Sequence, residues 1–351
     1  MDKAKKILFV TGSLNRGGAQ RVITLLANKY ADMGWEVHVA LMLFNNVGYQ
    51  ISDKIVIHDL AHGKSAKNAL KWVKELRDTI KNVSPSVIVS FVGRINLITM
   101  RASKGLGIPV VLSERNDPQH DRRSSFERSM CKSLYKKADK VVFQTRYQAD
   151  CYKDTVDNGV IIPNPISAPV YEGDHPVKDI ICVGKLMDQK NHPMMINAFA
   201  KIASEFPDTK VWIYGDGEKR ADLTALIRSL GLESRIIMPG NSNNVFEVMR
   251  ENEYFVMCSD YEGLSNALLE AMRSGMICVS TEWNGITDVI SDGENGFLVP
   301  VGDVDALADK LRLVLTSDNS EIRRNSIEAG KKYDSDTVME RWVDEINRLA
   351  L

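Results

Sequence analysis

The sequence predicts an α/β protein of two successive domains, each built on a doubly wound parallel sheet. From Ile7 onward, short apolar runs rich in Val and Ile alternate with longer segments of helical periodicity. A proline-containing stretch from Ile166 to Pro176 interrupts this alternation, which then resumes. The length of 351 residues is sufficient for two domains that each have a core. We therefore expect a linker between an N-terminal domain, residues 1–168, and a C-terminal domain, residues 169–334.

The N-terminal domain opens with a βαβ unit. A strand at Ile7–Val10 leads through a glycine-rich loop into a helix at Ala19–Met33, and a second strand follows at Glu36–Leu43. The glycines do not fit Gly-x-Gly-x-x-Gly, and no Lys-Ser/Thr follows as in a P-loop, but the alternation still predicts a Rossmann-like sheet. Further strands are expected at Ile55–His58, Val87–Phe91, Val110–Ser113, Lys140–Gln144 and Val160–Ile162, and further helices at Ala66–Lys81, Asn96–Lys104 and from Tyr147.

The C-terminal domain repeats the pattern. Its strands are expected at Ile180–Val183, Val211–Tyr214, Ile236–Met238, Tyr254–Cys258 and Ile277–Ser280, and its helices at Pro193–Phe206, Lys219–Leu230, Val245–Arg250 and Val304–Leu315. Residues 335–351 form a last helix that we expect to pack back on the N-terminal domain. Because parallel sheets bind ligands at their carboxyl edges, we expect the two domains to face each other across a cleft that holds the site.

The composition excludes several classes of partner. With 45 basic and 46 acidic side chains, nothing in the net charge of −1 indicates nucleic acid. The five cysteines have no CxxC spacing, which is typical of buried thiols in a reducing compartment. The apolar run Ile7–Val10 is too short for a signal sequence, and no window is long enough to span a membrane. We expect a cytoplasmic protein, and any contact with the inner face of the cell membrane should be peripheral.

The segment 259–272 has the pattern of a strand end, a tight loop and a helix start. The helix is expected to begin near Ser265 or Asn266, so the backbone N–H groups of residues 263–266 and the positive end of the helix dipole would face an anion such as phosphate. Glu262 in the loop and Glu270 within the helix could accept hydrogen bonds from sugar hydroxyls. The alternative is that both glutamates only follow the preference of acids for helix N-termini.

Two lysines in the loop after the strand Ile180–Val183 complete this pattern. Lys185 and Lys190, together with the helix start near Asn266, would make a site shaped for a diphosphate, although both could also be solvated surface lysines. No Asp-x-Asp pair stands at a strand end, so we expect no metal cofactor and assign the role of the cation to the lysines and the helix dipole.

With these motifs, residues 180–302 resemble the donor-binding domain of GT-B glycosyltransferases of the retaining group called family 4, or glycosyl transferases group 1. The resemblance is carried by Gly184-Lys185 with Gln189-Lys190-Asn191, Gly215-Asp216-Gly217, Glu262-Gly263-Leu264-Ser265-Asn266 with Glu270, and Gly285 followed by Asn295-Gly296-Phe297-Leu298-Val299-Pro300. In the first domain, Gly17-Gly18-Ala19-Gln20-Arg21 is similar to the glycine-rich acceptor-side loop of that family.

The resemblance implies a nucleotide-sugar as the donor substrate. Lys185 and Lys190 would bind its diphosphate, Glu270 its ribose, and Glu262 the sugar on the reacting face. Gly263, Leu264, Ser265 and Asn266 would offer backbone amides, and Gly17 and Gly18 would give the substrates room. Departure of the diphosphate builds negative charge, so cations there stabilise the transition state more than the ground state. Retention without an obvious nucleophile implies same-face attack assisted by the leaving phosphate.

Two positions depart from the family pattern. Many members have Arg where Lys185 stands, and Lys keeps the charge but not the bidentate contact. Many also carry a histidine in the first domain, where this chain reads Ser113-Glu114-Arg115-Asn116. Arg115 is therefore a candidate phosphate or sugar contact, with a structural arginine as the alternative, and the identity of any general base stays open.

The acceptor is indicated by a basic segment. Arg122, Arg123, Lys132, Lys136 and Lys137 are interleaved with apolar residues at helical spacing. One interpretation is an amphipathic surface on anionic lipid that reaches a polyprenyl-diphosphate-linked glycan, and the other is a helix with a core stripe and a solvated face.

The leading hypothesis is a retaining, metal-independent hexosyl- or N-acetylhexosaminyl-transferase that uses a UDP-sugar and extends a lipid-linked bacterial surface polysaccharide. The alternatives are a transferase for a soluble small-molecule acceptor, a NAD-dependent oxidoreductase, and a non-catalytic nucleotide-sugar-binding protein. The missing Gly-x-Gly-x-x-Gly disfavours the oxidoreductase.

Overall fold

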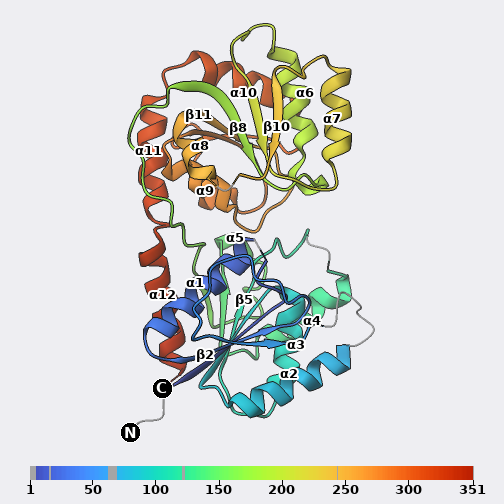
Figure 1. Ribbon diagram of the computed structural model, residues 1–351, viewed down its shortest axis with the longest axis vertical. Helices are drawn as coiled ribbons and strands as arrows, with labels where there is room; N and C mark the ends of the chain where they lie inside the picture. The colour runs from blue at the N-terminus through green and yellow to red at the C-terminus, as the bar shows by residue number, and fades with distance from the viewer. Residues whose placement is uncertain (1–4, 16, 62–68, 121–122, 243, 351) are drawn as a thin grey trace. The chain divides into compact units, whose positions relative to one another are not determined.

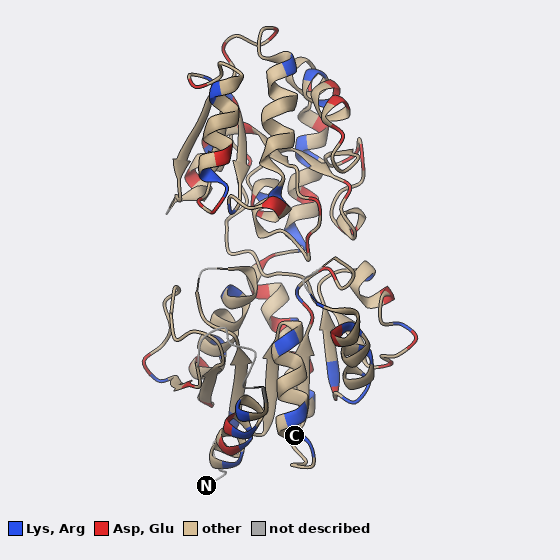
Figure 2. Cartoon of the chain, turned by 90° about the vertical axis from the view of Figure 1, so that its right-hand side faces the viewer, with Lys and Arg blue, Asp and Glu red and all other residues tan. Residues whose placement is uncertain are grey.

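The computed structural model describes residues 5–15, 17–61, 69–120, 123–242 and 244–350, which form two compact units (Figure 1). Unit 1 contains residues 1–165 and 335–351, and unit 2 contains residues 166–334. Lys and Arg are interspersed with Asp and Glu over both units (Figure 2), in keeping with the near-zero net charge. None of the helices in the described ranges combines the length and apolar character that crossing a bilayer requires.

In its described part, unit 1 holds a seven-stranded sheet in the order β3-β2-β1-β4-β5-β6-β7, and every pairing in it is parallel. The strands are β1 (Lys6–Thr11), β2 (Glu36–Leu41), β3 (Val56–Asp59), β4 (Val87–Phe91), β5 (Val110–Ser113), β6 (Lys140–Phe143) and β7 (Gly159–Ile161). The helices are α1 (Gly18–Asp32), α2 (Ala69–Val83), α3 (Gly93–Ser103), α4 (Ser125–Tyr135), α5 (Arg146–Asp150) and α12 (Ser335–Leu349).

The alternation of side chains along β1 explains why helices cover both faces of this sheet. Ile7 and Phe9 point to one face and pack with residues of α1 and α12, whereas Leu8 and Val10 point to the other and pack with residues of α2 and α3. On the first face, Trp342 of α12 is fully buried. The helix at the end of the chain is therefore part of the core of unit 1.

Unit 2 repeats the architecture with a described sheet of six parallel strands in the order β10-β9-β8-β11-β12-β13. The strands are β8 (Val177–Val183), β9 (Val211–Tyr214), β10 (Ile236–Gly240), β11 (Asn252–Met257), β12 (Ile277–Thr281) and β13 (Phe297–Val299). The helices are α6 (His192–Ile202), α7 (Arg220–Ser229), α8 (Val245–Glu251), α9 (Asn266–Arg273), α10 (Val304–Thr316) and α11 (Ser320–Lys331).

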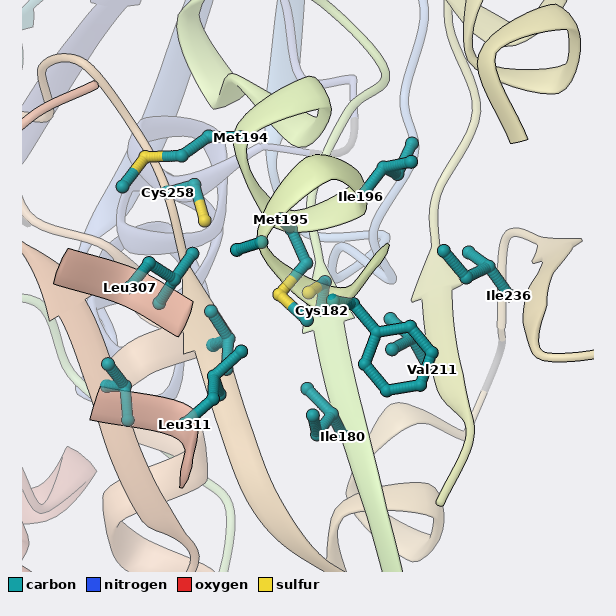
Figure 3. Close-up of a cluster of buried hydrophobic side chains, with 14 of the residues drawn as sticks. Ile180, Cys182, Met194, Met195, Ile196, Val211, Ile236, Cys258, Leu307 and Leu311 are labelled. Atoms are coloured by element: carbon teal, nitrogen blue, oxygen red, sulfur yellow. The ribbon is translucent and has the colours of Figure 1, made fainter. Parts of the chain in front are cut away.

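The core of unit 2 also lies on both faces of its sheet. Ile180 and Cys182 of β8 belong to a cluster with apolar residues of α6 and α10 (Figure 3) and of α7. Ile181 packs on the opposite face with residues of α8 and α9. The predicted fold class, two Rossmann-like doubly wound sheets, is thus confirmed.

Two elements were not predicted. Strand β13 has only three residues, and α11 contains few apolar residues among its charged ones, so neither gives a clear periodic pattern. The predicted beginning of the helix at Ala66 lies outside the described residues, and α2 is described from Ala69.

Candidate active site

Two loops meet at the carboxyl edge of the sheet in unit 2. One follows β8 and contains the 3-10 turn η2 (Asp188–Lys190), and the other follows β11, the strand that pairs with β8. The Gln189 side chain donates to the Tyr261 carbonyl at 2.7 Å, and the Asp260 N–H donates to the Gln189 carbonyl at 2.9 Å. Asn191 Nδ2 also donates to Asp260 Oδ1 at 2.8 Å. These bonds join the loops into one wall.

An ion pair links the same loops. Lys190 Nζ lies 2.5 Å from Glu262 Oε1, and Ser259 Oγ donates to the same oxygen at 2.7 Å. The Lys190 and Glu262 side chains are 17% and 10% exposed, so water screens the pair only partly. Thr281 Oγ1 in turn donates to the Ser259 carbonyl at 2.6 Å. The structure thus brings together two of the predicted site residues that are 72 positions apart.

Glycines make this close arrangement possible. A Cβ on Gly184 would lie 3.2 Å from Cε of Lys190, so the lysine stem lies against the glycine backbone. Gly215 has a φ of +142°, and a Cβ there would lie 1.8 Å from the Gly184 carbonyl oxygen. Glycine is therefore required at Gly215 for the loops after β8 and β9 to approach each other.

Helix α9 begins directly after the Glu262 loop. Its first residue is Asn266 and its N-cap is Ser265, as predicted, and the Ser265 side chain makes no capping hydrogen bond. Leu264 is buried in an apolar cluster, so of its groups only the backbone is placed to meet a ligand. The N-terminal end of α9 favours an anion through its backbone N–H groups and dipole. Glu270 lies one turn into α9 and is half-buried.

The loop after β8 contains Lys185 and is followed by His192, the first residue of α6. Lys185 is exposed and makes no ion pair with a residue that the structure describes. His192 is 5% exposed, and its ring makes a hydrogen bond with the Lys185 backbone. Burial lowers the pKa of His192 to about 4, so the ring is neutral at neutral pH. His192 thus supports the lysine loop from within.

Sequence reasoning missed the supporting roles of Ser259, Gln189 and His192. Each lies beside a predicted residue, but nothing in the pattern distinguishes a side chain that holds a loop from one that faces solvent. The available signal was position: Ser259 follows the buried strand β11, and His192 with Pro193 begins α6.

The predicted glycines of unit 1 lie at the start of α1, after β1. The Gly17 N–H donates to the Tyr49 hydroxyl at 3.1 Å, and that hydroxyl donates back to the Gly17 carbonyl at 3.2 Å. Gly18 is the first residue of α1, and no acidic residue lies in its first turn. This helix start therefore also has the polarity that favours an anion.

Arg115 occupies the interior of unit 1. Its guanidinium carbon lies 4.9 Å from the ring centre of Phe91 and 5.4 Å from that of Trp342, and Nη1 donates to Asn164 Oδ1 at 2.8 Å. The residue is 6% exposed, and burial lowers the pKa of its guanidinium. Arg115 therefore packs between the sheet and α12, and this position does not support its predicted contact with the donor.

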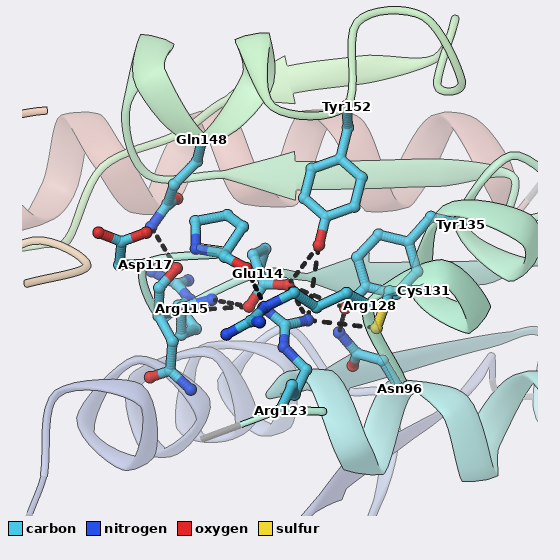
Figure 4. A network of polar contacts seen from close by, with 12 residues as sticks. Asn96, Glu114, Arg115, Asp117, Arg123, Arg128, Cys131, Tyr135, Gln148 and Tyr152 are labelled. Carbon is cyan, nitrogen blue, oxygen red and sulfur yellow. Dashed lines mark hydrogen bonds and ion pairs between the residues drawn. The ribbon is translucent and has the colours of Figure 1, made fainter. Parts of the chain in front are cut away.

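The expected membrane contact through Arg123 is wrong, because Arg123 is 8% exposed and points into unit 1 (Figure 4). Its Nη1 lies 2.8 Å from Glu114 Oε2, in an ion pair whose carboxylate is fully buried. The same oxygen accepts hydrogen bonds from the hydroxyls of Tyr135 and Tyr152 at 3.1 and 3.3 Å. A buried charge needs such partners, which explains why Arg123 does not turn outward.

The described lysines of the basic segment lie on the exposed side of α4, which is Ser125–Tyr135, or directly after its end. Cys131 and Tyr135 are buried, whereas Lys132, Lys136 and Lys137 are exposed, and Arg122 lies outside the described residues. Phe126, on the same helix, is 72% exposed. The helix is thus amphipathic, with an aromatic ring on its cationic face.

In the described ranges, no group of three or more His, Cys, Asp and Glu side chains is arranged to hold a metal ion. Asp303, which forms an Asp-x-Asp pair with Asp305 at the start of α10, accepts a hydrogen bond from the Ala306 N–H at 2.9 Å and caps that helix.

Two family models match the chain in succession. The model Glycosyltransferase Family 4 matches residues 16–168, and the model Glycosyl transferases group 1 matches residues 169–333.

Two curated relatives come from Campylobacter jejuni. The chain is 27% identical to the GalNAc-alpha-(1->4)-GalNAc-alpha-(1->3)-diNAcBac-PP-undecaprenol alpha-1,4-N-acetyl-D-galactosaminyltransferase, over 96% of this chain and 97% of that protein. It is 29% identical to the N-acetylgalactosamine-N,N'-diacetylbacillosaminyl-diphospho-undecaprenol 4-alpha-N-acetylgalactosaminyltransferase, over 87% of this chain and 89% of that protein.

A similar solved structure is that of Anabaena Alr3699/HepE in complex with UDP and glucose. The two structures have a TM-score of 0.83 and 18% sequence identity, over 98% of this chain and 100% of the other. The likeness in fold therefore extends over nearly the whole of both chains.

Proposed function

Because the chain belongs to the glycosyltransferases of family 4 and group 1, we propose that it moves a sugar from a nucleoside-diphosphate donor to a lipid-linked glycan. The donor is a UDP-sugar and the transferred group an N-acetylhexosamine or hexose. The transfer proceeds with retention of configuration and needs no metal ion. The observation that carries this proposal is the Lys190–Glu262 pair beside the N-terminal end of α9.

The geometry supports a diphosphate at this edge of the sheet. Lys185 supplies an exposed ammonium group, Lys190 a partly buried one, and α9 its N-terminal amides, all in loops or at a helix start at this edge of the sheet. When the bond between sugar and diphosphate breaks, negative charge grows on the leaving phosphate. Groups fixed in advance stabilise that charge without having to reorganise, which lowers the barrier.

We assign Glu262 and Glu270 to the two uncharged sugars of the donor, the transferred sugar and the ribose. Glu262 is held by Lys190 and Ser259, so its carboxylate is oriented before a ligand arrives, and we assign it the hydroxyls of the transferred sugar. Glu270, one turn into α9, is assigned the ribose hydroxyls. Attack by the acceptor on the same face as the leaving phosphate gives retention without an enzymic nucleophile.

The acceptor side of the proposal draws on the relatives and on α4. Both Campylobacter jejuni relatives are named for acceptors that carry undecaprenol through a diphosphate. In this chain, α4 presents Phe126 with Lys132 and Lys136, the combination that binds anionic lipid surfaces. We therefore assign the enzyme to the cytoplasmic membrane surface in the synthesis of a bacterial surface glycan, held there by peripheral contacts.

The test is release of UDP from UDP-GlcNAc or UDP-GalNAc in the presence of a bacterial membrane extract. Replacing Glu262 by Gln keeps the shape but removes the charge that orients Lys190 and the sugar, so we expect kcat/KM to fall by about 10²–10³. Lys201→Gln is the matched control, because Lys201 forms an exposed pair with Asp305 elsewhere in unit 2. That variant should keep full activity.

Two outcomes would contradict the proposal. Full activity in Glu262→Gln would show that the carboxylate does not touch the donor, and binding of UDP without any turnover would favour a non-catalytic nucleotide-sugar-binding protein. EDTA should leave the rate unchanged, since the lysines and α9 replace a metal. Loss of activity in EDTA that Mg²⁺ restores would overturn metal independence.

A further inference from the structure

Unit 1 contains a cavity of about 410 Å³ that is separate from the candidate active site of unit 2. It lies between α4, the loop after β5 and the turn after α5. Arg128 and Lys132 line it from α4 together with the hydroxyls of Ser125 and Ser129, and Gln119 and Cys151 line the opposite side. The cavity therefore presents two cations and several neutral polar groups on a half-enclosed surface.

The four residues from α4 form a stripe along one side of the helix. Ser125, Arg128, Ser129 and Lys132 follow the i, i+3, i+4, i+7 spacing that places side chains one above the other. Arg128 Nε donates to the Pro118 carbonyl at 3.0 Å, which fixes its guanidinium against the far wall. Lys132 makes no ion pair with a residue in the described ranges. Its ammonium group can therefore turn toward a ligand.

Two carboxylates outside the cavity lining bond to residues of its walls. Asp117 is 1% exposed and accepts the N–H of Gln119 at 2.8 Å and the hydroxyl of Tyr147 at 3.2 Å. Glu114 is fully buried and accepts a hydrogen bond from the hydroxyl of Tyr152 (Figure 4). Tyr152 in turn lines the cavity. Among the described residues that line the cavity, none is acidic. Arg128 and Lys132 therefore favour an anion there.

A neighbouring residue narrows the class of anion. Phe126 follows Ser125 in the first turn of α4. It is 72% exposed, which is unusual for a large aromatic residue. A free phosphate has no use for such a ring, but an amphiphile with an anionic head and a hydrocarbon chain does. The pairing of cationic cavity and exposed ring therefore fits a polyprenyl diphosphate.

We propose that this cavity binds the diphosphate of the lipid-linked acceptor, with Arg128 and Lys132 on the phosphates and Phe126 against the polyprenyl chain. The inference rests on the proposed function, since it names the place where that acceptor's diphosphate is held. It also gives the exposed ring of Phe126 a role at the lipid surface. The site lies wholly within unit 1 and can be tested without turnover.

Chemical labelling of the Cys151 thiol can report whether a ligand occupies the cavity. It is half-buried at the cavity wall, where Gln119 Nε2 lies 3.8 Å from its Sγ, whereas the other four cysteines are buried. Burial raises the pKa of the Cys151 thiol, so it reacts slowly with N-ethylmaleimide and is best labelled at pH 8.5. Intact mass then follows one addition per molecule, and Cys151→Ser should take up none.

The probes are farnesyl diphosphate, inorganic pyrophosphate and farnesol. At about ten times its Kd, farnesyl diphosphate should slow labelling about tenfold, as simple occupancy requires. Pyrophosphate should protect only at much higher concentration, and farnesol should not protect. In Arg128→Gln/Lys132→Gln the protection by farnesyl diphosphate should be lost. Lys153→Gln, which removes an exposed cation two residues from Cys151 but outside the cavity lining, should keep it.

Absence of protection by farnesyl diphosphate would overturn the inference, and so would protection that persists in the double variant. Equal protection by pyrophosphate and farnesyl diphosphate would identify a free-diphosphate site and overturn the lipid assignment. Because labelling needs no donor, UDP release without protection would leave the proposed function standing and remove only this site. Protection without UDP release would leave this site standing and contradict the proposed function.

Discussion

Each unit contains a glutamate that follows a parallel strand and pairs with a cation, but the two pairs differ in their surroundings. Glu114 follows β5 and pairs with Arg123 at 2.8 Å, and their side chains are 0% and 6% exposed. Glu262 comes five residues after β11 and pairs with Lys190 at 2.5 Å, with exposures of 10% and 17%. The position at a strand end is therefore shared, and it does not by itself decide what the carboxylate does.

The donors around each carboxylate explain the difference. Glu114 receives, besides Arg123, the hydroxyls of Tyr135 and Tyr152, whose rings stack 5.2 Å apart. These large side chains are fixed by packing. Glu262 receives the flexible Lys190 and the small hydroxyl of Ser259. A carboxylate enclosed by rigid donors holds the fold together, whereas one held by adjustable donors can exchange them for a ligand.

The comparison predicts its largest effect for Glu114→Ala. The substitution leaves Arg123 buried without its counter-charge, so the free energy of unfolding of unit 1 should fall by about 3–5 kcal/mol. Glu262→Ala should cost clearly less than this, because Lys190 is 17% exposed and its flexible side chain can reach water. Urea denaturation followed by circular dichroism measures both. Similar losses in the two variants would mean that the two carboxylates are both structural, and the distinction would fail.

The free energy of unfolding should also depend on pH through His192, which supports the loop that carries Lys185 and Lys190. Its pKa is lowered to about 4 in the folded protein, mainly by burial, so between pH 6.5 and 4 the unfolded chain binds a proton that the folded one does not. Stability should therefore fall as the pH decreases through this window, by about 2 kcal/mol from this group at pH 5. In His192→Asn the decline between pH 7 and 5 should be smaller by that amount.

The measurement is thermal or urea unfolding of both proteins at pH 7 and pH 5. Other histidines contribute equally to the two curves, so their difference isolates His192. Parallel curves would show that the ring is already hydrated in the folded state and does not support the loop.

The fold and the part of the candidate site that lies in unit 2 were predictable from sequence because their signals are local or periodic. Buried parallel strands are continuous apolar runs, and the start of α9 at Asn266 follows from capping preferences. Lys190 and Glu262 were each placed in a loop after a strand, and parallel strands bring such loops to one edge. Their direct contact then follows from the pairing of β8 with β11.

The position of Arg123 was not predictable, because the described lysines of the same basic segment, Lys132, Lys136 and Lys137, face solvent. Only the fold shows that Glu114, nine residues earlier, lies beneath it. For a related reason the sequence could not decide between a ligand contact and a structural role for Arg115. It takes a site-like place after β5, but Trp342, 227 positions away, stacks on it from α12. Contacts of this range leave no periodic trace in a single sequence.

The smallest effect tests whether Glu262 depends on an adjustable donor. Ser259→Ala removes the hydroxyl 2.7 Å from Glu262 Oε1 but leaves Lys190 in place, so the carboxylate keeps its charge and loses one orienting bond. A single hydrogen bond of this kind contributes about 1 kcal/mol, which predicts a fall in kcat/KM of about fivefold and no measurable change in stability. Ser229→Ala, at the exposed end of α7, is the matched control and should behave as the unmodified protein. A loss as large as that of Glu262→Gln would show that the hydroxyl itself contacts substrate. An unchanged rate would mean that Lys190 alone orients the carboxylate, so that Glu262 is as firmly held as Glu114 and the contrast between rigid and adjustable donors does not explain their roles.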